Sequence, residues 1–78
     1  MSHDETFNPY AKIIRMANQI GTFFNSKPRE EGVAGTAEHI NKFWEPRMRR
    51  HFFEVMDKGG EGFLPIVKDA SALIRRPS

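Results

Sequence analysis

The sequence contains no cysteine, and this absence excludes several kinds of site. Disulfide bonds cannot form, and iron–sulfur clusters and Cys-type zinc sites lose their thiolate ligands. A chain of 78 residues buries only about 60% of the surface that its unfolded form exposes, so the stability of the isolated chain is expected to be small. Close helix packing or a partner chain is left to supply stability.

Long apolar runs are also absent. No stretch approaches the roughly 20 apolar residues of a membrane span, and residues 1–10 lack the layout of a signal peptide. A formal net charge of +2 is weak support for nucleic-acid binding. The sequence therefore indicates a cytoplasmic protein that binds neither membrane nor nucleic acid.

No run alternates apolar and polar residues as β strands do. The sequence instead predicts an all-α fold, a small bundle of three to four short helices, in a single domain over residues 1–78 with a flexible tail at 1–7. Proline and glycine positions place these helices at about 9–25, 29–44, 46–58 and 65–76.

The first predicted helix begins at Pro9 with Asn8 as its N-cap. Its apolar residues occupy about half of the circumference at about 100° per residue, so we expect the other helices to pack against it. These residues are Tyr10, Ile13, Ile14, Met16, Ala17, Ile20, Phe23 and Phe24.

The second predicted helix carries two glycines, Gly32 and Gly35, which weaken it by about 1 kcal/mol each relative to Ala. They are tolerable only if close packing against a neighbour offsets that cost. Its apolar arc comprises Val33, Ala34, Ala37, Ile40 and Trp44.

The third helix starts at Pro46 and stops at the glycine-rich turn of residues 59–62, and the fourth runs from Pro65 to the residue before Pro77. The last turn of the fourth helix is expected to hold Arg75 and Arg76, where the helix dipole favours cations. Its apolar stripe comprises Ile66, Val67, Ala70, Leu73 and Ile74.

The segment "FWEPRMRR" at 43–50 is the candidate binding site. Arg47, Arg49 and Arg50 lie at the start of the third helix, where each positive charge is disfavoured by about 0.3–1 kcal/mol. Three guanidinium groups beside free backbone N–H groups attract carboxylates or phosphates. Trp44 is predicted to lie in the core at the corner between helices. The wheel also places Arg49 beside Phe53 at the edge of the apolar face, which predicts a surface patch.

These residues, Trp44, Arg47, Arg49, Arg50 and Phe53, form the predicted partner interface. The wheel also places Arg50 one turn before Glu54, so that the two can pair for about 0.3–0.5 kcal/mol, and the alternative that Arg47 and Arg50 lie on a solvated face stays open.

No residue pattern indicates catalysis, cofactor binding or a metal site in this chain. His3, His39 and His51 lack partners at metal-ligand spacing, and no Ser/His/Asp constellation occurs. The "GGEG" sequence at 59–62 lacks the preceding strand and the following Lys-Ser/Thr of a phosphate-binding loop. Binding is the function class that remains.

Three stretches together resemble a known family: "RMANQIGTFF" at 15–24, "HINKFWEPRMRR" at 39–50 and "GGEGFLPIV" at 59–67. They resemble the delta subunit of the bacterial cytoplasmic NAD-dependent formate dehydrogenases that contain molybdenum or tungsten. The resemblance runs from Lys12 to Arg76. Its matching motif residues are Asn18, Gln19, Gly21, Phe43, Trp44, Pro46, Arg47, Met48 and Arg49.

The resemblance implies a non-catalytic accessory subunit of an alpha-beta-gamma-delta complex that oxidises formate to carbon dioxide and reduces NAD. In that family the alpha subunit carries bis-molybdopterin guanine dinucleotide with Mo or W and iron–sulfur clusters, and the beta subunit carries FMN. The delta subunit is expected to bind the alpha subunit and to support complex stability or cofactor insertion.

Some alternatives stay open at the level of sequence. A small helical nucleic-acid binder could use the Arg47, Arg49 and Arg50 cluster, although Glu and Asp residues surround it. The chain could be a permanent subunit or a transient assembly factor, and the fourth helix could pack on its own bundle or on the partner.

Overall fold

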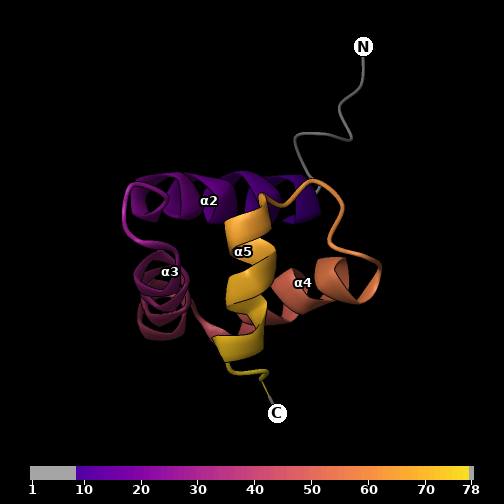
Figure 1. Ribbon diagram of the computed structural model, residues 1–78. Coiled ribbons are helices and arrows are strands. Elements are labelled where there is room, and N and C mark those ends of the chain that lie inside the picture. The colour runs from indigo at the N-terminus through magenta and orange to yellow at the C-terminus, as the bar shows by residue number, and fades with distance from the viewer. Residues whose placement is uncertain (1–8, 78) are drawn as a thin grey trace.

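The computed structural model describes residues 9–77 and is all-α within that range, as predicted (Figure 1). A short 3-10 turn, η1, follows the last α-helix. The predicted Asn8 cap and the tail at 1–7 lie outside the described residues. The elements are α2 (Pro9–Phe24), α3 (Arg29–Phe43), α4 (Pro46–Asp57), α5 (Pro65–Ala70) and η1 (Ser71–Leu73).

Prolines mark three of the helix starts, as the sequence predicts. Pro9, Pro46 and Pro65 each occupy the first position of a helix, where the missing N–H group would have no intrahelical partner. The turn after α4 contains Gly59, Gly60 and Gly62 at φ 110°, 68° and 100°. Only glycine adopts this left-handed region without strain, so the turn prediction is confirmed.

The helix α2 contacts each of α3, α4 and α5, as predicted for the first helix. Figure 1 shows α2 across one end of the molecule, with α5 extending away from it between α3 and α4. The helix α5, which is the fourth predicted helix, packs on α3 and is therefore part of the same bundle. At the centre of the core, the ring of Phe52 stacks on Phe63 with centroids 4.8 Å apart.

Close approach of Phe24 explains both glycines of α3, through its main chain at Gly32 and through its ring at Gly35. A Cβ atom on Gly32 would lie 2.6 Å from the carbonyl oxygen of Phe24, and one on Gly35 would lie 2.5 Å from the ring of Phe24. Such distances are too short for real atoms. The expectation that close packing offsets the cost of these glycines is therefore confirmed.

The fourth helix is shorter than the predicted 65–76. It ends at Ala70, and the chain passes through η1 into an extended segment, residues 74–77, that we call the C-terminal segment. The side chain of Asn41 causes this change of course. Its amide nitrogen donates to the carbonyl of Leu73 (3.0 Å) and its oxygen accepts from the backbone N–H of Arg75 (2.8 Å). These bonds to α3 satisfy main-chain groups that a longer helix would satisfy internally.

The predictions that depended on a longer fourth helix are wrong for the same reason. Arg75 and Arg76 do not lie in the last turn of a helix, and Pro77 does not end one. Leu73 is 54% exposed and is not part of the buried stripe, whereas Ile74 is buried although it lies outside the helix.

The apolar arcs of α2 and α3 were also predicted too wide. Phe23 is 68% exposed and Ala34 is exposed, so neither lies in the core. The sequence missed Gly21 and Thr36, which are buried. Thr36 reaches the core because its hydroxyl donates to the carbonyl of Gly32 at 2.8 Å, within its own helix.

Candidate functional site

Two members of the predicted partner interface are buried. Trp44 is 6% exposed and its ring meets Phe52 edge to face, so its prediction as a core residue at the corner is confirmed. Phe53 is only 7% exposed, and the guanidinium of Arg76 lies over its ring, 4.3 Å from the centroid. The predicted exposed patch of Arg49 and Phe53 is therefore wrong, because the C-terminal segment returns to cover that ring.

Arg49 is engaged inside the chain. Its Nη1 atom donates to the backbone carbonyl of Arg75 at 2.7 Å. Its Nε atom is buried and makes no hydrogen bond to any described residue. The nucleic-acid hypothesis requires three free arginines, and this contact removes one of them.

A second arginine contact holds the C-terminal segment on α4. The guanidinium of Arg76 contacts the carboxylate of Asp57 through two bonds, Nη2 to Oδ1 at 2.6 Å and Nη1 to Oδ2 at 3.3 Å. The hydrogen bond from Arg76, together with its charge, holds the pKa of Asp57 below its usual value, and a slight loss of hydration acts in the opposite direction. Both side chains are exposed, so the pair contributes little stability and serves mainly to set geometry.

Arg47 and Arg50 are the exposed arginines of α4. The pair of Arg50 with Glu54 that the sequence allowed is not formed, and Glu54 instead accepts a hydrogen bond from the hydroxyl of Tyr10 at 2.6 Å. The ion pairs among residues 9–77 involve neither Arg47 nor Arg50. Glu45 precedes α4 and forms no capping bond with its side chain. Arg47 thus lies in the first turn of α4, where positive charge is disfavoured, and neither Arg47 nor Arg50 forms an ion pair within the described chain.

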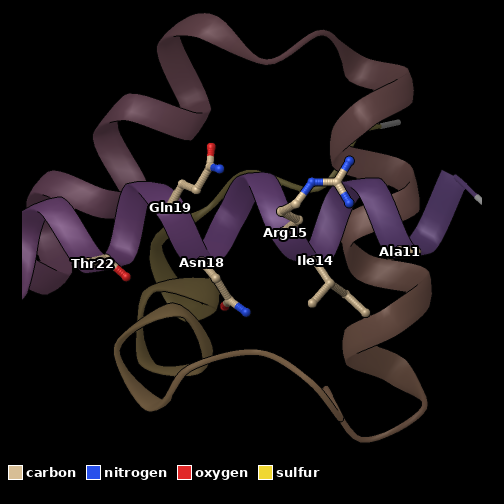
Figure 2. A pocket seen from close by; sticks show the side chains of 6 residues that line it. All are labelled: Ala11, Ile14, Arg15, Asn18, Gln19 and Thr22. Carbon is tan, nitrogen blue, oxygen red and sulfur yellow. The ribbon is translucent and has the colours of Figure 1, made fainter.

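The motif residue Asn18 has a structural role. Its amide nitrogen donates to the carbonyl of Gly62 and its oxygen accepts from the backbone N–H of Leu64, both at 2.9 Å. Figure 2 shows Asn18 and Ile14 projecting from α2 toward the loop between α4 and α5, whereas Arg15 and Gln19 point away from that loop. The shallow surface hollow beside them contains no paired acid or base that would suggest chemistry.

A second hollow, which the sequence did not predict, lies between α2 and α3. We call it the aromatic groove, and it measures about 330 Å³. The exposed ring of Phe43 lies beside His39, which lines the groove, with 4.7 Å between the two ring centroids. The wheel placed Phe23 on the apolar face of the first helix, so this exposed surface was not predicted. The lining residues are Gln19, Ile20, Phe23, Phe24 and His39.

The described histidines contact aromatic rings. His39 lies against Phe43, and His51 meets the ring of Tyr10 edge to face at 5.7 Å. His3 lies outside the described residues. Within 9–77 no three His, Asp or Glu side chains gather closely enough to hold a metal ion. No helix of the described range has the length and apolarity needed to cross a membrane.

Comparison with known proteins agrees with the resemblance of the three motifs. Residues 12–71 match the family model of the NADH-dependent formate dehydrogenase delta subunit, FdsD. The match includes all of α3, α4 and α5 and most of α2. No curated protein and no solved structure is significantly similar to the chain. A match over most of the chain shows the family: the chain belongs to the delta subunits of the NAD-dependent formate dehydrogenase complex.

Proposed function

We propose that this chain is a non-catalytic accessory subunit that binds the large alpha subunit of a cytoplasmic formate dehydrogenase. Bound there, it supports the stability of the complex or the insertion of cofactor. The other subunits would carry the bis-molybdopterin guanine dinucleotide with Mo or W, the iron–sulfur clusters and FMN, and would convert formate and NAD to carbon dioxide and NADH. Membership of the delta subunit family supports the association with this complex.

The observation that carries the proposed binding surface is the state of the arginines on α4. Arg49 and Arg76 have partners within the chain, whereas Arg47 and Arg50 are exposed without one among residues 9–77. At Arg47, in the first turn of α4, positive charge costs about 0.3–1 kcal/mol. Carboxylates of a partner subunit would compensate it through charge-assisted hydrogen bonds, for which the planar guanidinium is well suited.

The buried members of the predicted interface take a supporting part in this proposal. Trp44 and Phe53 lie beneath the surface and fix the start and the middle of α4 against the core. Arg49 holds the C-terminal segment beside the same helix. The surface that would touch the alpha subunit is thus carried by Arg47 and Arg50.

A charge-reversal experiment tests this surface. We expect Arg47→Glu/Arg50→Glu to lose the complex at moderate salt during copurification, while its far-UV circular dichroism stays that of the wild type. Lys12→Glu/Arg15→Glu, an equal charge change on exposed positions of α2, is the matched control and should remain bound. Arg49→Glu is a poorer test, because it also breaks the bond to Arg75. Retention of the α4 variant in the complex would contradict the proposed surface.

A stoichiometric measurement separates the two forms of this role. A permanent subunit is present in equal amount with the alpha subunit in the purified active enzyme. An assembly factor is depleted there and enriched on the alpha subunit before cofactor insertion. Quantitative mass spectrometry of the two preparations distinguishes these outcomes.

A further inference from the structure

We propose that the C-terminal segment opens away from α4 while the helices stay folded, and that the surface it uncovers binds a carboxylate group of the alpha subunit. This inference rests on the proposed function, because the alpha subunit is the expected partner. It adds Arg49 and Phe53, which the segment contacts in the closed chain, to the exposed arginines of the same helix. We call Arg49 and Phe53 the covered surface.

The C-terminal segment is attached by bonds that lie at the molecular surface. Residues 75–77 make no hydrogen bond between main-chain groups within the described chain. Their hydrogen bonds run instead to the side chains of Asn41, Arg49 and Asp57, and all of these bonds are exposed. Water replaces exposed bonds when they break, so each of them adds little to the stability of the closed chain.

One apolar side chain anchors the segment. Within residues 74–77 only Ile74 belongs to the core. An open segment regains the conformational freedom of all its residues, which offsets much of the gain from burying a single Ile. Few buried contacts and exposed hydrogen bonds are the features of regions that open locally, so this opening is separate from unfolding of the bundle.

The closed segment satisfies Arg49 incompletely, and this indicates the chemistry of the second ligand. The Nη1 atom donates to the neutral carbonyl of Arg75, and Nη2 makes no hydrogen bond within the described chain. The Nε atom is buried without a partner. A carboxylate bridges Nε and Nη2 with two charge-assisted bonds, which are stronger than one bond to a carbonyl. A ligand reaches the buried Nε only after the chain around it moves, and the segment bonded to this guanidinium is the weakly held part.

Phe53 gives the covered surface an apolar part. Its ring is 7% exposed because the guanidinium of Arg76 lies over it. Arg49 and Phe53 lie one turn apart on α4, so a chain whose carboxylate binds Arg49 also reaches this ring. Arg50 directly follows Arg49, so the covered surface adjoins the proposed one. Aromatic and arginine side chains together are enriched at protein interfaces.

A crosslink tests whether the opening is used. The chain has no cysteine, so Asp57→Cys/Arg76→Cys carries the only two thiols. A short bismaleimide that joins them holds the segment closed, and the matched control is the same variant with each thiol capped by N-ethylmaleimide. We expect the crosslinked form to bind the enzyme complex, purified without this chain, at least about tenfold more weakly than the capped form. A longer linker that lets the segment move should restore binding.

A second variant tests the carboxylate. Arg49→Lys keeps the positive charge and can still donate to the carbonyl of Arg75, but it loses the planar edge that a carboxylate bridges. We expect it to weaken the measured Kd at least about tenfold, with unchanged far-UV circular dichroism. Arg15→Lys, the same change at an exposed position of α2, is the control and should bind as the wild type does.

Each contrary outcome has a separate meaning. If the crosslinked and capped forms bind equally well, the opening is not used, and the proposed function survives. If the short and long linkers weaken binding equally, the linker itself blocks the contact and the inference is overturned. Binding of Arg49→Lys at the strength of the wild type also overturns it, because no carboxylate then bridges Arg49. If the wild type itself does not bind the complex, the proposed function fails and this inference fails with it.

Discussion

Replacement of Asn18 by Ala is expected to destabilise the fold strongly, although its side chain is not in the hydrophobic core. The amide bonds the main chain on both sides of Phe63, at the carbonyl of Gly62 and at the N–H of Leu64. Each neutral hydrogen bond contributes about 0.5–1.5 kcal/mol, and a partly buried N–H group left without a partner costs about 1–3 kcal/mol. We therefore expect a loss of about 2–3 kcal/mol in the free energy of unfolding.

This loss is large for so short a chain. At about 0.05–0.15 kcal/mol per residue, its whole stability is of the order of 4–12 kcal/mol. Thermal unfolding followed by far-UV circular dichroism should show the midpoint of Asn18→Ala about 10–20 °C below that of the wild type. Gln19→Ala is the control, because its neighbouring side chain is exposed and makes no hydrogen bond to a described residue. Equal midpoints for Asn18→Ala and Gln19→Ala would refute the reasoning.

Two further predictions concern one ionisation and one glycine. The hydrogen bond to Glu54, helped by burial and by the negative charge of Glu54, raises the pKa of Tyr10 above its usual 10.0. The stability that this hydrogen bond contributes is therefore fully present below pH 10.0, and it is lost as the pH rises through the pKa of Tyr10 in the folded chain. Absorbance titration of this single tyrosine should show late ionisation, and Glu54→Gln should move the midpoint down; coinciding midpoints would contradict the assignment. Gly32→Ala is expected to destabilise by about 1–2 kcal/mol in urea unfolding, because the clash with the carbonyl of Phe24 outweighs the gain of about 1 kcal/mol in helix propensity. A more stable variant would show that the backbones separate easily.

The starts of the helices could be predicted because their signals are local. Pro9, Pro46 and Pro65 constrain the backbone at their own positions, and no distant residue is needed to read them. The end of the fourth helix could not be predicted in this way. It is set by Asn41 on α3, whose side chain competes for the main chain of residues far along the sequence.

The candidate site was predicted only in part for a similar reason. A helical wheel assigns Phe53 to a face of α4 but says nothing about Arg76, which returns from the end of the chain to cover it. The wheel also treats an apolar arc as buried across its whole width. On α2 the buried positions are Ile13, Ala17 and Gly21, one turn apart, so Phe23 at the edge of the arc remains in solvent.

The C-terminal segment sets the length of the shortest useful fragment. The family match ends at residue 71, and the last α-helix ends at Ala70. Ile74 lies beyond both and is nevertheless buried. The carbonyl of Arg75 accepts a hydrogen bond from Arg49, and the guanidinium of Arg76 covers the ring of Phe53. A fragment trimmed to the matched region would expose Phe53 to water, so an expressed fragment of this chain should extend beyond the final helical turn.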